Sequence, residues 1–402
     1  MIDLPNDQEA SGRSFGEGEL GFLREVLNSG TLTATKGSFT PRFERDLASL
    51  LGVRHAIACS SGTAAIHSAV AALDLEPGDE VVTTSITDMG ALTPILYQGL
   101  IPVFADVDPD TGNVTAQTIG AALSERTKAV IVTHLFGNPV DTEPIRALLS
   151  GRGITLIEDA AQSFLARSDG HYAGTLGDIA CFSLQQGKHI TSGEGGVVVT
   201  DDDRLAHETR LFVNKSWPYG EANPDHRKLG LNYRITELQS AVLTAQLAKL
   251  ADFVERRQKL ATELGARLEG IRGLRAPVVR PQDRSAYWRY TILVDEEALP
   301  GGVSGLAAGL RERGVAAAPR YIGKPAFRCG IFADRKTLGS SSWPLSLARP
   351  EALDYSEARF PGTFSYLSRV VVIPWNERFD TEHIDYLGTA IREIAETLGS
   401  AS

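Results

Sequence analysis

The sequence predicts an α/β protein with a large, mostly parallel, seven-stranded sheet domain and a smaller C-terminal α+β domain. The first observation behind this prediction is a series of seven short apolar runs between about residues 55 and 200, separated by longer amphipathic segments. Several runs are almost continuously apolar, which is typical of strands covered by helices on both faces. The second observation is a long helical stretch at 232–272, after which strands and helices mix. Regular alternation of strands and helices indicates a parallel sheet.

Each apolar run is expected to be one strand of the large sheet. The runs lie at 55–59, 79–86, 101–108, 129–137, 154–161, 178–184 and 195–201. Three intervening segments, 62–74, 115–126 and 141–151, have the length and spacing of helices. Only Gly-rich loops separate the last runs, so we expect some antiparallel pairing among them.

The remaining chain is expected to leave the large domain through a helix and to build a second, smaller core. Residues 232–272 carry apolar side chains at three- and four-residue steps, which indicates a helix. After it we expect a loop and strand at 277–299, a helix at 302–314, a long loop at 325–365, a strand and turn at 366–379, and a helix at 381–398. A chain of 402 residues exceeds one ordinary core. We therefore expect two domains, 1–250 and 251–402.

Composition and charge exclude several classes of function. Forty Lys and Arg against fifty Asp and Glu give a net charge of −10, which repels nucleic-acid phosphates and anionic membrane surfaces. No apolar stretch approaches the roughly 18 residues of a membrane span. Three cysteines, Cys59, Cys181 and Cys329, form no CxxC pair, which argues against a structural metal and for a reducing compartment. We expect a cytoplasmic protein with no metal, no nucleic-acid partner and no membrane partner.

A small-residue turn after the first run, CSSGTAA at 59–65, is a candidate phosphate site. It leads from a strand into a helix, where the backbone N–H groups of Gly62, Thr63 and Ala64 would be free. A helix N-terminus with free N–H groups suits an anion. Plain helix capping is the alternative interpretation of the same turn.

Asp159 ends the apolar run in LIEDAAQSF at 156–164, and Gln162 follows about one helical turn later. A carboxylate buried there is costly unless a cation pairs with it. The protonated ring nitrogen of a pyridine cofactor is one such cation, because an Asp at this nitrogen lets the ring withdraw electrons from a carbanion. The alternative is an Asp that caps the next helix.

Lys188 lies in the loop FSLQQGKHITSGEGG at 182–196, with Ser183 upstream and three glycines downstream. Its neighbours are uncharged, and this context suits an amine held inward to form a Schiff base. A solvated surface lysine is the alternative. Further along, the polar triplet from Asn232 to Arg234 opens the long helix, where N-terminal capping is the alternative.

In this order the motifs resemble the fold-type I enzymes that use pyridoxal 5′-phosphate, and more narrowly the DegT/StrS family of sugar aminotransferases. The resemblance also includes FERDLASLLG (43–52), PGDEVV, YQGLIPVFADVD, VTHLFGNPVD, NYRITELQSAVLTAQL and IPWNERF (373–379), so it covers nearly the whole chain. It implies a fold-type I transferase whose large domain, 1–250, binds the cofactor.

The resemblance also implies roles for individual residues. Lys188 would form the imine with the cofactor and then shuttle the proton, so Lys188 and Asp159 would be the catalytic residues. Asp159 would pair with the pyridinium nitrogen and Gln162 would contact the ring's phenolic oxygen. Gly62, Thr63 and Ser183 would hold the phosphate, and Asn232 would reach the phosphate of the other subunit in a homodimer with shared active sites.

Two segments depart from the family pattern. The family usually places an aromatic residue after Thr87, where this chain has Asp88 and then Met89. We expect Asp88 and Met89 at the cofactor, with Met89 covering the ring; a differently built turn is the alternative. The second segment, 213–226, offers Trp217 and Tyr219 and is expected near the substrate entrance, or else as an exposed loop.

The predicted function is therefore a ping-pong aminotransferase. Glutamate or glutamine would give its amino group to the cofactor, and the ketone of a keto sugar, with a nucleotide-linked sugar favoured, or of a keto-cyclitol would take it, in biosynthesis of an amino sugar for a glycan or antibiotic. One alternative is a sugar dehydratase of the same fold, in which histidine replaces the lysine; here Lys188 is present and His189 follows it. The other is a regulatory protein without turnover.

Overall fold

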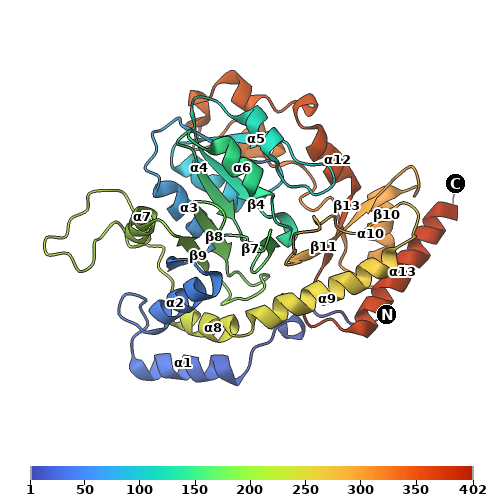
Figure 1. The fold of residues 1–402 in the computed structure, drawn as a ribbon, viewed down its shortest axis with the longest axis horizontal. Coiled ribbons are helices and arrows are strands. Elements are labelled where there is room, and N and C mark those ends of the chain that lie inside the picture. The colour runs from blue at the N-terminus through green and yellow to red at the C-terminus, as the bar shows by residue number, and fades with distance from the viewer. Residues whose placement is uncertain (1, 401–402) are drawn as a thin grey trace.

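A computed structural model describes residues 2–400 and contains the predicted seven-stranded sheet (Figure 1). Its strand order is β1-β9-β8-β5-β4-β2-β3. The strands are β1 (His55–Cys59), β2 (Glu80–Thr84), β3 (Ile101–Ala105), β4 (Thr127–Thr133), β5 (Thr155–Asp159), β8 (Ile179–Ser183) and β9 (Gly196–Thr200). Pairing is parallel from β3 through β2, β4 and β5 to β8, whereas β9 is antiparallel to both of its neighbours. The expected antiparallel pairing near the end of this region is confirmed.

Helices cover both faces of this sheet, which explains why its strands are apolar throughout. Val198 of β9 packs in one buried cluster with α3 (Gly62–Ala71) and α7 (Asp203–Val213). Its neighbours Val197 and Val199 pack in another cluster with α2 (Phe39–Leu51). Successive side chains of a strand point to opposite faces, so both faces of β9 are buried. The other helices of this region are α1 (Glu17–Ser29), α4 (Thr93–Tyr97), α5 (Ala116–Ala122) and α6 (Thr142–Leu149).

The predicted helix at 232–272 is two helices in the structure, α8 (Glu237–Leu247) and α9 (Leu250–Leu268). Thr236 starts α8 with a capping box, in which its side chain accepts from the Gln239 amide. The prediction of one continuous helix was wrong because the two halves pack on different partners. α8 packs on α1 and α2, whereas α9 packs on α13 (Thr381–Ser400). The spacing of apolar residues along the sequence gives no information on this change of packing partner.

A second, four-stranded antiparallel sheet has the order β10-β11-β13-β12. Its strands are β10 (Leu274–Arg275), β11 (Arg289–Val294), β12 (Ala318–Pro319) and β13 (Val370–Pro374), and α10 (Gly302–Glu312) packs against it. Tyr290 and Trp375 are buried in its core, against which Leu4 also packs. We propose that the boundary between the domains lies between α8 and α9. The N-terminal segment nevertheless reaches the small-sheet side, where Figure 1 shows both termini.

Residues 325–365 are not the long surface loop that the sequence predicts. Short helical turns follow one another there, namely η4 (Ala326–Arg328), α11 (Gly330–Ala333), η5 (Leu345–Leu347), η6 (Pro350–Leu353), η7 (Glu357–Arg359) and the start of α12 (Pro361–Arg369). Phe327 and Phe332 lie edge-on to Phe104 of β3, with ring centroids 5.6 and 5.2 Å away. The prediction was wrong because these aromatic side chains enter the large-domain core at irregular spacing.

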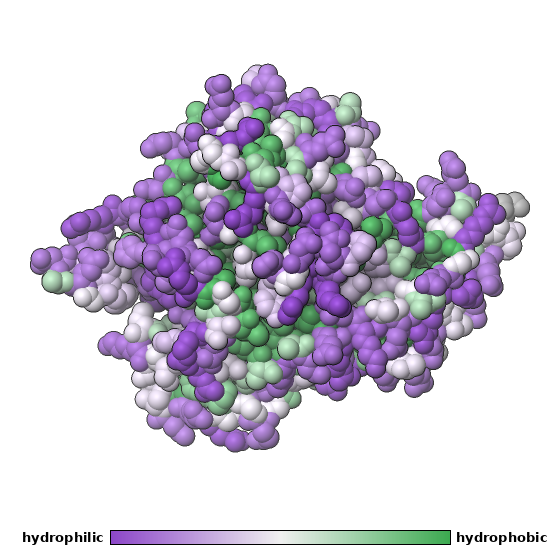
Figure 2. All heavy atoms as spheres, viewed as in Figure 1, coloured by the Kyte–Doolittle hydropathy of each residue, from purple (hydrophilic) through white to green (hydrophobic). Residues whose placement is uncertain are grey.

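Charged and polar side chains cover most of the face drawn in Figure 2, with smaller apolar areas between them. Among residues 2–400, no helix has the length and apolar composition needed to cross a bilayer. The remaining short elements are η1 (Ala10–Gly12), η2 (Met89–Ala91), η3 (Leu135–Gly137) and the hairpin β6 (Arg167–Ser168) with β7 (His171–Tyr172).

Candidate active site

A pocket of about 320 Å³ opens beyond the carboxyl ends of β1, β2, β5 and β8. This is the edge at which an open α/β sheet binds its ligands. Seven of the nine predicted site residues line it: Gly62, Thr63, Asp88, Asp159, Gln162, Ser183 and Lys188. They come from four separate segments of the chain. Met89 and Asn232 are not among the lining residues.

The first turn of α3 forms one wall of the pocket. Ser61 caps this helix, and its hydroxyl accepts from the Ala64 amide at 3.0 Å. The Ala64 amide is therefore occupied, and the expectation that it is free was wrong. The amides of Gly62 and Thr63 precede the first helical hydrogen bond and have no acceptor within the helix. A Cβ at Gly62 would lie 2.8 Å from the Ser183 Cβ, so only glycine lets these two segments approach and form a cup.

Asp159 ends β5 on the floor of the pocket and is 5% exposed. Its Oδ2 accepts from the Thr133 hydroxyl at 3.2 Å and its Oδ1 from the Ala161 amide at 3.1 Å. Burial raises the pKa of this carboxyl group, because the charged form loses solvation. The backbone bond to Ala161 and the charge of Lys188 oppose that rise. A cation arriving in the pocket would complete the stabilisation of the carboxylate.

Glu158 precedes Asp159 in β5 and points to the other face of the sheet. Its carboxylate accepts from His134 Nε2 at 2.8 Å and from three backbone amides. Burial works against ionisation, yet the hydrogen bond from His134 lowers the pKa of Glu158 overall. His134 Nδ1 accepts from the Val140 amide, which fixes the Nε2–H tautomer. This pair is fully satisfied and leaves Asp159 as the acid that faces the pocket.

Lys188 is held inside the pocket by the loop between β8 and β9. Its Nζ lies 4.1 Å from the centroid of the Trp288 ring. Burial, with a smaller contribution from nearby Arg289, lowers the pKa of its amine to about 8, although the charge of Asp159 opposes this change. A pKa this close to neutrality makes the uncharged, nucleophilic amine accessible. His189 is fully buried, and its Nε2 lies 3.0 Å from the Ala286 carbonyl oxygen, so it faces away from the pocket.

Gln162 is anchored at both ends of its amide. Its Oε1 accepts from the Phe136 backbone N–H at 2.6 Å and its Nε2 donates to the Tyr321 hydroxyl at 3.4 Å. Burial raises the pKa of Tyr321 to about 12, so this phenol stays protonated. Arg320 and Tyr321 both have positive φ, 62° and 43°. Consecutive non-glycine residues in this region are strained, and the turn places the Tyr321 ring in the pocket.

Trp288 and Tyr321 also line the pocket, although the sequence did not predict them. Trp288 directly precedes β11, and Tyr321 follows β12, so both come from the small-sheet half of the chain. The aromatic cluster around Trp288 was visible in the sequence, but no local pattern placed it beside a lysine in another domain. Tyr321 carried no local signal.

Met89 and Asn232 lie elsewhere. Met89 begins η2 and packs against the core cluster that contains α3. Asp88 occupies the position at the pocket, where its Oδ1 accepts from the Gly90 amide at 2.7 Å. Asn232 is exposed and forms a backbone bridge with Asn214. Asn232 therefore does not line the Lys188 pocket of its own chain.

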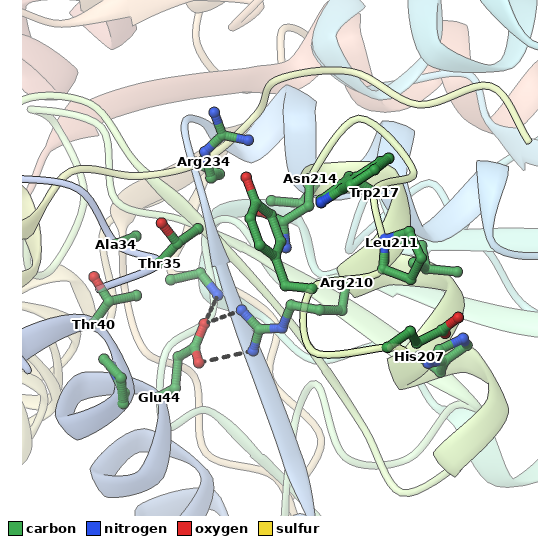
Figure 3. Close-up of a pocket in the computed structure, with 16 residues that line it drawn as sticks. Ala34, Thr35, Thr40, Glu44, His207, Arg210, Leu211, Asn214, Trp217 and Arg234 are labelled. Carbon is green, nitrogen blue, oxygen red and sulfur yellow. Dashed lines mark hydrogen bonds and ion pairs between the residues drawn. The ribbon is translucent and has the colours of Figure 1, made fainter. Parts of the chain in front are cut away.

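Trp217 and Tyr219 of the 213–226 segment line a separate pocket of about 330 Å³ (Figure 3). Glu44 and Arg210 form a two-pronged ion pair on its wall, with both N–O distances 2.8 Å. This pocket shares no lining residue with the one that holds Lys188. The expectation that the segment lies near the substrate entrance is not met within a single chain.

The residues of the Lys188 pocket fit a phosphorylated pyridine aldehyde. The cup at Gly62 offers free amides and a hydroxyl for a phosphate. Asp159 offers a buried carboxylate for a protonated ring nitrogen, and Lys188 an amine for an aldehyde. No group of three or more His, Cys, Asp or Glu side chains within residues 2–400 could hold a metal ion.

Fold and site together define a pyridoxal-phosphate-dependent transferase of the α/β type. Residues 14–392 match the DegT/DnrJ/EryC1/StrS aminotransferase family. The chain belongs to this family and is a pyridoxal-phosphate-dependent aminotransferase.

Two curated relatives and one solved structure illustrate the similarity. The GDP-perosamine synthase of Caulobacter vibrioides is 35% identical over 301 residues, which are 74% of this chain and 79% of that protein. The spore coat polysaccharide biosynthesis protein SpsC of Bacillus subtilis is 30% identical over 396 residues, 95% of each chain. The crystal structure of the aminotransferase TlmJ from Streptoalloteichus hindustanus superimposes with a TM-score of 0.83 at 29% identity and covers 96% of this chain and 98% of that one.

Proposed function

We propose that this enzyme moves an amino group from glutamate or glutamine to the ketone of a nucleotide-linked keto sugar. The class of acceptor is supported by the 35% identity to a GDP-perosamine synthase, whose name describes an amino sugar joined to a nucleotide. A polysaccharide biosynthesis protein among the relatives supports an amino-sugar product. The buried amine of Lys188 favours amino transfer over the dehydratase alternative, because His189 faces away from the pocket.

Each pocket residue has its own role in the proposed reaction. Bound pyridoxal phosphate supplies an electron-withdrawing ring that stabilises negative charge at the carbon losing its proton. The uncharged Lys188 amine takes that proton and returns it at the next position, which its pKa near 8 allows close to neutral pH. Asp159 keeps a proton on the ring nitrogen, Gln162 orients the ring through its phenolic oxygen, and the cup at Gly62, Thr63 and Ser183 holds the phosphate.

A homodimer with shared sites is part of the proposal. Asn232 is exposed and outside its own pocket, as expected of a residue that serves a neighbouring subunit. Four large apolar side chains on and around α1 are also exposed, namely Phe15, Leu20, Leu27 and Leu32. Exposed apolar side chains gathered in one region are typical of a subunit interface. The unpaired thiols of Cys59, Cys181 and Cys329 suit the reducing cytoplasm.

The single observation that carries the proposed function is the Lys188 amine, buried in the same pocket as Asp159 and the glycine cup. The test compares the purified parent with Lys188→Ala. Glutamate, glutamine and alanine are offered in turn; we expect glutamate or glutamine to bleach the visible band of the bound cofactor in the parent, and a keto sugar to restore it. Nucleotide-linked keto sugars, free keto sugars and keto-inositols are offered in turn. Lys188→Ala should fold, bind the cofactor without the parent's band and give no turnover; turnover at the parent rate would reject the proposal.

A further inference from the structure

The loop that carries Lys188 has no regular secondary structure, so its shape depends on individual hydrogen bonds. Inside the loop, the Lys188 amide donates to the Gln185 carbonyl at 2.9 Å and the Gln186 amide donates to Gly193 at 2.8 Å. These bonds use the amides of the loop. The carbonyl groups of residues 186–188 accept hydrogen bonds from side chains outside the loop.

Three consecutive carbonyl groups of this loop are held by two buried side chains. The Arg13 guanidinium donates from Nη2 to the Gln186 carbonyl and from Nη1 to the Lys188 carbonyl, the latter at 2.8 Å. The Trp288 indole N–H donates to the Gly187 carbonyl between them at 2.7 Å. A guanidinium presents its N–H groups in a rigid planar fork. Arg13 therefore fixes the peptide planes 186–187 and 188–189, which flank the Gly187–Lys188 peptide held by Trp288.

Arg13 is itself held in place by a hydrogen bond to the backbone of the N-terminal segment. Its side chain is 3% exposed, and its Nε donates to the Asp7 carbonyl oxygen at 2.8 Å. The Gln186 side chain donates to that same Asp7 oxygen at 3.0 Å. The Asp7 carbonyl oxygen therefore accepts from both Arg13 and Gln186, while the Arg13 side chain donates both to Asp7 and to the Lys188 loop. Neither the segment 7–13 nor the loop can shift alone without breaking a buried hydrogen bond.

The Asp7 carboxylate links Arg13 and the Lys188 loop to residues of the small-sheet half of the chain. Arg289 of β11 donates to its Oδ2 at 2.9 Å, and the Asn376 amide after β13 donates to its Oδ1. Arg257 of α9 lies 3.6 Å from Oδ1 and pairs with Glu377 at 2.6 Å. Three guanidinium groups surround two carboxylates, so the cluster carries one positive charge in excess. The hydrogen bonds that Arg13 and Arg257 donate to backbone carbonyl oxygens stabilise this buried charge.

We propose that Arg13 is a positioning residue, which holds the backbone at Lys188 from outside the pocket through its hydrogen bonds to the Gln186 and Lys188 carbonyl groups. The N-terminal segment is thereby part of the active-site support. Amino transfer needs the Lys188 amine to reach two carbon positions in turn, and a displacement of about 1 Å at a reacting group can cost on the order of 10²-fold in rate. Arg13 does not line the Lys188 pocket. The inference rests on the proposed role of Lys188.

The test uses the cofactor-loaded enzyme with Arg13→Lys and Arg13→Gln. Arg13→Lys keeps the buried positive charge but has no planar fork. The matched control is Arg378→Gln, because Arg378 is exposed and donates to the backbone carbonyl of Arg13 at 2.9 Å without touching the loop. We expect amide hydrogen exchange in residues 185–190 to quicken at least tenfold in Arg13→Gln. We expect its kcat to fall at least tenfold while the KM for the donor stays within about threefold. Arg13→Lys should be intermediate and Arg378→Gln close to the parent.

One further readout separates positioning from general stability. The pH midpoint of the cofactor's visible band should rise in Arg13→Gln, which loses a positive charge, and stay unchanged in Arg13→Lys. Parent-like exchange and kcat in both Arg13 variants, even with a lower melting temperature, would overturn the inference, as would an equal loss in Arg378→Gln. If Arg13→Gln does not fold, Arg13→Lys decides alone. The Lys188→Ala result separately reports on the proposed function, because the exchange measurement does not depend on turnover.

Discussion

The Lys188 Nζ lies 4.1 Å from the centroid of the Trp288 ring, and the indole N–H of Trp288 donates to the carbonyl of Gly187, the residue before Lys188. One aromatic side chain therefore contacts both the amine and the backbone of its loop. Trp288 directly precedes β11 of the small sheet, whereas Lys188 follows β8 of the large sheet. The small-sheet half of the chain thus supplies a wall of a pocket that the large sheet otherwise builds. The face of an indole attracts a cation, which orients the amine across the pocket.

Replacement of Lys188 by methionine should stabilise the cofactor-free protein near neutral pH. Burial lowers the pKa of the amine from 10.5 to about 8, so at pH 7 the folded state holds a poorly solvated ammonium group. This lowering of the pKa corresponds to roughly 3 kcal/mol against the charged amine in the folded state. Between pH 8 and 10.5 the unfolded chain binds this proton and the folded chain does not, so the parent's free energy of unfolding rises with pH. The advantage of Lys188→Met should shrink accordingly.

Urea unfolding of both proteins at pH 7 and pH 10 measures this difference. Lys36→Met is the control, because Lys36 is exposed and its substitution should give a small, pH-independent change. An advantage of Lys188→Met that stays constant with pH would contradict the lowered pKa.

Asp159→Asn should slow the donor half-reaction by on the order of 10²-fold while the protein still binds cofactor. The substitution keeps the shape of the side chain and a hydrogen bond from Thr133 or Ala161, but it removes the charge that holds a proton on the ring nitrogen. A buried hydrogen bond to a charged group contributes roughly 2–3 kcal/mol, and the loss falls on the transition state and therefore on kcat. Stopped-flow absorbance with glutamate measures the rate.

The control for this prediction is Asp178→Asn. Asp178 accepts from the Leu156 amide at the opposite end of the same sheet, so the variant removes an equal charge far from the pocket and should react at the parent rate. An unchanged rate in a cofactor-loaded Asp159→Asn enzyme would mean that Asp159 is only a turn-forming residue.

Gly62→Ala should weaken cofactor binding at least tenfold without unfolding the protein. Its new Cβ would lie 2.8 Å from the Ser183 Cβ and 3.0 Å from its Oγ, so the first turn of α3 must move away from β8 and the phosphate cup must open. The dissociation constant for pyridoxal phosphate, measured by fluorescence or absorbance titration, tests this. Gly120→Ala in α5 is the control, since its Cβ would make only an ordinary contact at 3.6 Å. Equal affinity in Gly62→Ala and the parent would place the phosphate elsewhere.

The large sheet was predictable because its information is local. Each strand is buried on both faces, so the apolar run in the sequence and the strand in the structure coincide, as at 178–184 and β8. The same holds for the site residues at strand ends. Asp159 and Ser183 terminate β5 and β8, and parallel strands bring such ends to one edge of the sheet.

The parts that could not be predicted depend on contacts between distant segments. Phe327 and Phe332 look like loop residues in the sequence, and only the ring of Phe104 gives them a place in the core. Trp288 and Tyr321 enter the pocket because the small sheet packs beside the large one, which no motif near them records. Met89 was expected over the cofactor ring by alignment with a family pattern, yet the turn at Asp88 directs it into the core cluster.

Mixing two inactive variants should restore activity if Asn232 serves the partner's site. In a heterodimer of Lys188→Ala and Asn232→Ala chains, one pocket combines an intact Lys188 from the second chain with an intact Asn232 from the first. Random exchange makes about half of the dimers mixed, each with one complete site, so activity should reach roughly one quarter of the parent value. The control mixture pairs Lys188→Ala with Asp159→Asn chains. Lys188 and Asp159 line one pocket of one chain, so no mixed dimer contains a complete site and activity should not rise. Subunit exchange is verified with differently tagged chains; verified exchange without recovered activity would show that Asn232 acts within its own chain or is dispensable.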